Sequence, residues 1–154
     1  MHFWVFNCRP DAYDHKRSFR EGKVILWRVQ GNLATRPAVG DVVFVHLCMG
    51  TGKYRVGNEG RGVVAMGEVI GDVAFGEEAE ADKHLWRANA RGARGKAEML
   101  RVPVRLTVVK TDRPLRSDAL VESGVDIQCF RPQGYRGTNI RLSDDVGRRL
   151  QTML

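Results

Sequence analysis

The heptapeptide from Lys23 to Val29, KVILWRV, is the stretch on which the fold and function of this chain depend. It is mostly apolar and rich in β-branched residues, which is typical of a β-strand. Alternation places Trp27 on the face of Ile25 and Val29, and Arg28 on the opposite face. Trp27 is therefore either one more core residue or the open wall of a pocket, with Arg28 at the rim.

Further apolar stretches on both sides of this heptapeptide predict more strands. They are residues 2–7, 42–49, 63–73 and 99–110. Pro103 within the last stretch predicts an edge position or a bulge. Polar and glycine-rich connections separate the strands without regular strand–helix alternation, so a parallel Rossmann-type sheet is not expected.

The helical patterns are short. Residues 8–22 predict a loop with at most one helical turn, and the acidic stretch 76–86 predicts a short helix. Ser117 is expected to cap one helix that ends at Gly124, and Ser143 is expected to cap the last helix. The apolar stripe of that last helix comprises Val146, Leu150 and Met153. The fold class predicted is α+β, a small, mixed, mostly antiparallel β-barrel with short peripheral helices.

Length and composition limit the classes of protein to consider. A chain of 154 residues fits a single domain, residues 1–154, with its own core. No apolar run approaches the length of a membrane span, and the first residues lack the layout of a signal peptide, so a cytoplasmic protein without a membrane partner is expected. The net charge of +7, carried mainly by arginine, favours a polyanionic partner such as nucleic acid.

Motifs for catalysis, metal binding and cofactor binding are absent from the sequence. No P-loop, GxSxG or HExxH pattern occurs. The three cysteines, Cys8, Cys48 and Cys129, form no CxxC pair, and His46 beside Cys48 is interpreted as packing. The acid–base cluster DAYDH (11–15) is interpreted as turn chemistry. We therefore expect no metal and no cofactor, and the sequence gives no support for an enzyme.

Five stretches, in their order and spacing, resemble the EVE domain, a branch of the PUA-like pseudobarrels related to the YTH and ASCH domains. They are FWVFNCRPDAY (3–13), ILWRV (25–29), VGDVVFVHL (39–47), RGVVAMGEV (61–69) and RPQGYRGTNIRLS (131–143). The resemblance covers almost the whole chain and implies a PUA-like pseudobarrel. It also implies a reader that holds a nucleobase, commonly a modified one, between aromatic walls. EVE-like domains in bacteria accompany modification-dependent nucleases, but this chain has no nuclease motif.

The resemblance also implies which residues form the base pocket. A flipped base loses a few kcal/mol of stacking and pairing, and stacking on an aromatic wall returns ~1–3 kcal/mol. Trp27 lies where a cage tryptophan is expected and Asn7 near the pocket floor, whereas Tyr13 is one of several possible second walls. The predicted base-pocket residues are Asn7, Trp27, Arg28, Trp86, Gln133, Gly134 and Tyr135.

The phosphate backbone is expected to lie on a basic loop, RANARGARGK (87–96), and on arginines and lysines nearby. These predicted phosphate-binding residues are Lys53, Arg55, Arg61, Arg87, Arg91, Arg94, Lys96, Arg131 and Arg136. The sequence leaves DNA and RNA, the modification and the sequence context open. Three alternatives remain: an RNA-binding protein of tRNA or rRNA metabolism, a small nucleoside-processing enzyme that uses the same cavity, and a non-catalytic partner of another protein.

Overall fold

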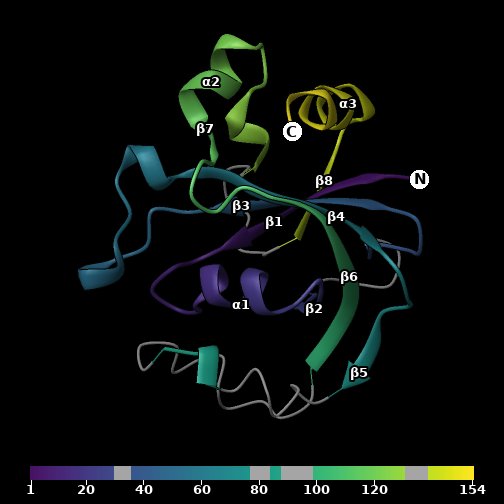
Figure 1. Ribbon diagram of the computed structural model, residues 1–154. Coiled ribbons are helices and arrows are strands. Elements are labelled where there is room, and N and C mark those ends of the chain that lie inside the picture. Colours follow the sequence, from purple (N-terminus) through teal and green to yellow (C-terminus); the bar gives the residue numbers. More distant parts are fainter. Residues whose placement is uncertain (30–35, 77–83, 88–98, 131–138) are drawn as a thin grey trace.

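The computed structural model describes residues 1–29, 36–76, 84–87, 99–130 and 139–154 (Figure 1). Its strands are β1 (Phe3–Cys8), β2 (Val24–Arg28), β3 (Val42–Leu47), β4 (Gly62–Val69), β5 (Ala74–Gly76), β6 (Met99–Val109), β7 (Leu115–Arg116) and β8 (Asn139–Leu142). The α-helices are α1 (His15–Glu21), α2 (Ser117–Glu122) and α3 (Asp144–Met153). Short 3-10 turns are η2 (Gly52–Tyr54), η3 (Asn58–Gly60) and η5 (Ile127–Phe130).

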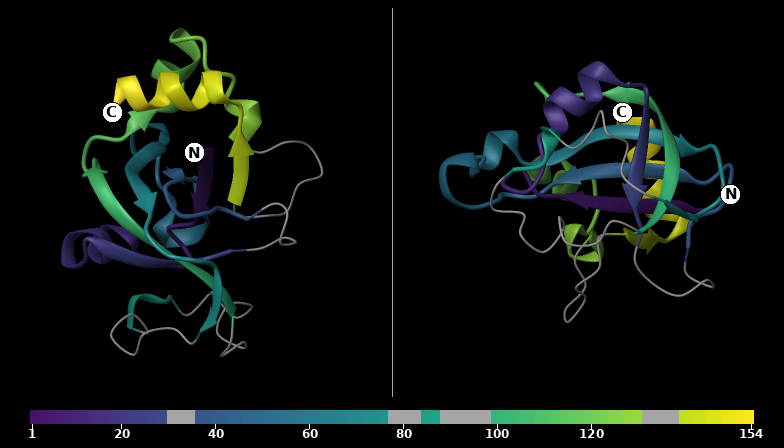
Figure 2. Two further views of the ribbon diagram at one scale, coloured as in Figure 1. Left: turned by 90° about the vertical axis from the view of Figure 1, so that its right-hand side faces the viewer. Right: turned by 90° about the horizontal axis from the view of Figure 1, so that it is seen from below.

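The described strands form one curled sheet in the order β2-β6-β4-β3-β1-β8, with β5 added to β6 and β7 to β4 (Figure 2). Every pairing is antiparallel except that of β1 with β3, which runs from Phe3 opposite Val42 to Cys8 opposite Leu47. A parallel pair needs a crossover connection, and here the chain between β1 and β3 contains α1 and β2. The α+β class and the mostly antiparallel sheet with short helices are confirmed.

All five strands expected from the sequence are present, but three short strands and one helix differ from the expectation. The segment 8–22 contains α1, a seven-residue helix, because Asp14 accepts a hydrogen bond from the Arg17 N–H and Phe19 is buried in the core. Strands β5, β7 and β8 were not expected. The predicted helix over 76–86 does not begin at Gly76, which ends β5, and residues 77–83 lie outside the described residues.

Two of the helix caps test the capping predictions. Ser143 caps α3, accepting a hydrogen bond from the Val146 N–H at 3.4 Å, so that prediction is confirmed. The prediction for Ser117 is wrong, because Ser117 is already the first helical residue and Arg116 occupies the cap position without a side-chain hydrogen bond. Beyond that helix, Gly124 has φ +77, the left-handed conformation that glycine adopts without steric cost.

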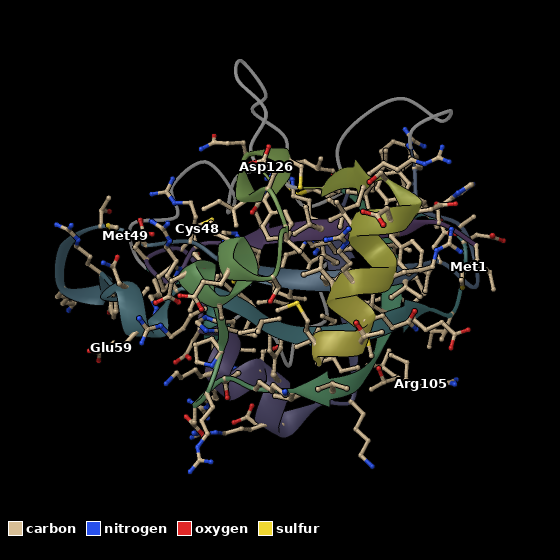
Figure 3. The ribbon with its side chains drawn as sticks, turned by 90° about the horizontal axis from the view of Figure 1, so that it is seen from above. Met1, Cys48, Met49, Glu59, Arg105 and Asp126 are labelled. Atoms are coloured by element: carbon tan, nitrogen blue, oxygen red, sulfur yellow. The ribbon has the colours of Figure 1, made fainter. Side chains whose placement is uncertain are left out.

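The sheet has an apolar core on each face. The first, here called the barrel core, contains Trp4, Phe6 and Val45, and Phe19 of α1 covers it. The second, here called the helix-side core, contains Phe3 and other buried residues beneath α2 and α3, which lie over this face of the sheet (Figure 3). Successive residues of β1 thus alternate between the two cores, as a strand buried on both sides requires.

The predicted turn at Gly40–Asp41 is a structural junction. Gly40 has φ +85, and the next residue, Asp41, is 2% exposed. The Asp41 carboxylate accepts hydrogen bonds from the His2 N–H at 2.7 Å, the Trp4 indole N–H at 2.8 Å and the Ala38 N–H at 3.0 Å. One buried carboxylate therefore joins the start of β1 to the start of β3 and fixes their parallel register.

Candidate nucleic-acid interface

Trp27 lies near the end of β2, a terminal strand in the order of the sheet. Its backbone is opposite Val102 of β6, and its ring packs on Phe6 of the barrel core, with 5.3 Å between the ring centroids and 31° between the planes. The side chain is only partly buried, whereas Phe6 is fully buried. The indole is thus supported by the core on one side and is not sealed within it.

Arg28 follows Trp27 and points to the other face of β2, as the alternation predicts. It is partly buried and lies opposite Arg101 of β6 in the strand register. Nothing in the sequence distinguishes Arg101, yet this residue is 8% exposed, unusually little for an arginine. Trp27 and Arg28 therefore occupy opposite faces of one edge strand.

Asn7 is not brought together with Trp27, because it faces the helix-side core. Its amide N–H donates to the Phe130 carbonyl at 3.0 Å, and its amide oxygen lies 3.0 Å from His46 Nδ1. The His46 ring makes an edge contact with Phe130, at 5.2 Å between centroids. Asn7 thus fastens the last residue of η5 to the sheet, an arrangement that explains this asparagine without any ligand.

Tyr13, a possible second wall, and Trp86, a predicted base-pocket residue, contact each other. Their backbones form an isolated antiparallel bridge, and their rings meet edge to face at 5.0 Å. Hydrogen bonds from the Asp14 N–H to the Leu85 carbonyl and from the Arg87 N–H to the Ala12 carbonyl, both 2.9 Å, hold the bridge. Residues 84–87 are therefore tied to the start of α1.

Arg87 links this bridge to the glycine-rich segment 49–61, here called the arm. Its guanidinium lies 3.9 Å from the centroid of the Tyr54 ring, and it forms an ion pair with Asp14 at 3.4 Å. The amino group of Lys53 lies 5.1 Å from the same ring centroid. Hydrogen bonding to Arg87 lowers the pKa of the Tyr54 phenol. Two predicted phosphate-binding residues, Lys53 and Arg87, are thus brought together at the ring of Tyr54.

The arm extends beyond the sheet at the end opposite Met1, as the positions of Met49 and Glu59 show (Figure 3). The Thr51 hydroxyl holds its base by donating to Asp11 at 2.9 Å. Lys53 and Arg55 are exposed on it. Arg61 is instead partly buried, and its Nε–H donates to the Ser117 hydroxyl at 3.4 Å. The arm therefore presents two exposed cations, and Arg61 is turned towards α2.

The remaining predicted residues lie outside the described residues. They are Gln133, Gly134 and Tyr135 of the base pocket, and Arg91, Arg94, Lys96, Arg131 and Arg136 of the phosphate-binding set.

His15, like Arg101, is a polar residue whose burial the sequence did not reveal. Asp14 of the DAYDH cluster caps α1, in agreement with turn chemistry, but His15 is 4% exposed. Both of its ring nitrogens are buried without a hydrogen-bond partner, and burial lowers the pKa of this imidazole to about 4. The Nε of Arg87 is buried and unpaired as well. A histidine directly after a helix cap gives no sequence signal for burial.

No three His, Cys, Asp or Glu side chains within the described residues gather in a way that would hold a metal ion. No helix within the described ranges is both long and apolar enough to cross a membrane.

Comparison with known proteins gives matches in structure alone. No protein-family model matches the chain, and no curated protein matches its sequence. Among solved structures, human THYN1 in complex with 5-methylcytosine-containing DNA matches with a TM-score of 0.56 and 10% identity, over 99% of this chain and 97% of that one. A hypothetical protein from Leishmania major matches with a TM-score of 0.55 and 16% identity, over 99% and 94%. The YTH domain of mmi1 in complex with RNA matches with a TM-score of 0.53 and 13% identity, over 99% and 80%.

At these identities the likeness concerns the fold. Each of these matches spans 99% of this chain, and therefore its curled, mostly antiparallel sheet and its short helices. The chain therefore has the PUA-like fold that THYN1 and the YTH domain share.

Proposed function

We propose that this chain is an EVE-like, single-domain reader that binds a nucleic-acid strand and accepts one modified base against the indole of Trp27. The observation that carries the proposal is the partly exposed Trp27 ring, held on Phe6 at an edge strand of the sheet. An aromatic ring that is fixed from behind offers a flat apolar surface at little further entropic cost. The THYN1 complex with 5-methylcytosine DNA and the mmi1 complex with RNA, which share the fold, support this class of ligand.

The exposed cations of the described residues supply the second component of binding. Lys53 and Arg55 extend from the arm, and the partly buried Arg87 lies with Lys53 against the ring of Tyr54. Contacts of this kind bind phosphates without regard to sequence and release counterions, so their contribution falls with salt. Trp27 would therefore determine selectivity for the base, and the cations would determine affinity for the backbone. The two roles can be separated by experiment.

The test is a titration of the protein with short oligonucleotides, as DNA and as RNA, that carry C, 5-methyl-C, 5-hydroxymethyl-C, A or N6-methyl-A. The wild type is expected to prefer one modified base over its unmodified parent. Trp27→Ala should lose ~1–3 kcal/mol of binding, about 5- to 150-fold in Kd, and lose the preference. Phe75→Ala is the matched control, because Phe75 is an exposed aromatic (74%) on β5.

The salt dependence of Kd isolates the cations. Lys53→Gln is expected to weaken binding of all oligonucleotides alike and to reduce the slope of log K against log salt by about 1. Trp27→Ala is expected to keep the wild-type slope. Equal affinity of wild type and a folded Trp27→Ala variant for every base would refute the reader. A preference for RNA without any preference for modification would favour the tRNA or rRNA alternative, and turnover of a nucleoside would favour the enzyme.

A further inference from the structure

Two arginines face each other across the edge of the sheet. Arg28 and Arg101 are directly opposite in the antiparallel register of β2 and β6, so both side chains leave the same face. Directly opposed like charges destabilise a strand pair, and a buried arginine normally has an anionic partner. Arg101 is only 8% exposed. The arrangement therefore needs a compensating negative charge.

The described residues do not provide that charge. The Nε–H of Arg101 donates to the Gly76 carbonyl at 3.3 Å, and Ala74 of β5 lies opposite Arg101 in the strand register. Within the described part of the chain, neither Arg28 nor Arg101 forms an ion pair with a carboxylate. Arg105 forms no ion pair with Glu68 either, but it lies further along the same face of β6 and opposite that acidic residue of β4 in the register. The strand register thus places Arg28 opposite a second cation and Arg105 opposite a residue of the other charge.

We propose that Arg28 and Arg101 form an oxyanion site that takes a phosphate group. A guanidinium presents five N–H donors in a planar fork that matches phosphate oxygens. The Gly76 carbonyl uses one donor of Arg101, which leaves the terminal amino groups of that side chain for a ligand. A phosphate between the two arginines satisfies these donors and replaces repulsion between two cations with attraction of both to one anion.

The position of the site links it to the proposed reader, and this link alone rests on the proposed function. Trp27 and Arg28 are consecutive residues on opposite faces of β2, a terminal strand in the order of the described sheet. A polynucleotide that crosses this edge can place one base on Trp27 and an adjacent phosphate between Arg28 and Arg101. The phosphate site itself stands without the base.

Thermal unfolding of the whole chain with inorganic phosphate tests the site. The ionic strength is kept constant with chloride, so only a specific anion effect is measured. The melting temperature of the wild type is expected to rise by about 5–10 °C at a hundredfold excess of phosphate over its Kd. Arg28→Gln should abolish the rise, and Arg105→Gln, the matched control on the same face of β6, should keep it. Arg101→Gln should also abolish the rise, and Arg101→Lys should restore part of it.

The sign of one further measurement separates binding from a structural role. In phosphate-free buffer, Arg28→Gln is expected to melt at or above the wild-type temperature, because the substitution removes a repulsion. A purely structural arginine would lower it. Because Arg28 is only partly buried, this variant keeps the test valid even where Arg101→Gln fails to fold. Equal responses of wild type and Arg28→Gln to phosphate, or no response of either, would overturn the proposal.

Oligonucleotides without modified bases identify the source of the phosphate. Oligothymidylate binding that weakens about tenfold in Arg28→Gln, and not in Arg105→Gln, assigns the site to the nucleic-acid backbone. Unchanged oligothymidylate binding, with the phosphate effect still dependent on Arg28, assigns it to free phosphate. Phosphate stabilisation without base selectivity would end the proposed reader and leave this site. Base selectivity without phosphate stabilisation would end the proposed phosphate site and leave the proposed reader.

Discussion

Replacement of Asp41 is expected to test the junction between β1 and β3. Its carboxylate, 2% exposed, accepts three hydrogen bonds, from the His2 N–H, the Trp4 indole N–H and the Ala38 N–H. Asp41→Ala leaves these donors facing an apolar methyl group. A buried donor without a partner costs ~1–3 kcal/mol. Only the bond from Trp4 is fully buried, so water can reach part of the rest.

We therefore expect Asp41→Ala to lower the free energy of unfolding by about 4 kcal/mol, a large part of the ~5–15 kcal/mol of a typical domain. Urea denaturation followed by fluorescence measures this change, and the melting temperature should fall by about 8–16 °C. In a double-mutant cycle with Trp4→Phe, the two changes should couple by about 1–2 kcal/mol, because the second loses a partner that the first has already removed.

Asp112→Ala is the matched control for the Asp41 experiment. The Asp112 side chain is 66% exposed and forms surface ion pairs with Arg20 and Lys16, so its removal should leave the unfolding curve unchanged within error. A loss below about 1 kcal/mol for Asp41→Ala, or additive effects with Trp4→Phe, would show that this carboxylate does not hold the strand register.

Two further predictions concern α3 and α1. Gly147→Ala should destabilise the protein by about 2 kcal/mol despite the better helix propensity of alanine, because the new methyl group would overlap Phe3, 2.5 Å from its Cβ. Gly57 has open space around it, so Gly57→Ala should leave the stability unchanged. A stabilised Gly147→Ala variant would contradict the close approach of α3 to Phe3. The lowered pKa of His15, about 4, means that the unfolded chain binds a proton that the folded chain refuses, so stability should be lost as the pH falls from 6.5 towards 4, by at most about 3 kcal/mol. Denaturation curves of wild type and His15→Gln between pH 7 and 4.5 should converge on acidification, and parallel curves would refute the assignment to His15.

The strands could be predicted because their signal is local. Apolar, β-branched runs such as VVFVHL (42–47) predict a strand regardless of what it pairs with. Helix α1 has no such signal, because Phe19 is the one apolar side chain in HKRSFRE and no periodicity results. Strand β8 is a four-residue segment with an arginine inside it, and its pairing with β1 creates it. Elements that exist through tertiary contact are not visible in one sequence.

In the candidate site, too, local features could be predicted and contacts between distant segments could not. Alternation correctly placed Trp27 and Arg28 on opposite faces of one strand, since that property is local. Alternation could not relate Asn7 to Trp27, because it does not show which faces of two different strands lie on the same side of the sheet unless their pairing is known. The contact of Tyr13 with Trp86 joins residues far apart in the chain, and strand pairing places Arg101 between Arg28 and Ala74.

The pairing of β1 has a consequence for the synthesis of this protein. One edge of β1 is covered by β3, but the other waits for β8, in which Leu142 lies opposite Phe3. At ~5–20 residues per second, the ribosome needs roughly 5–20 s more to make that partner after β3 has emerged. For this time, the aromatic segment FWVF (3–6) carries unsatisfied backbone groups that can recruit a neighbouring nascent chain. Slower initiation or a chaperone that shields this segment should therefore raise the yield of folded protein more than a stronger core would.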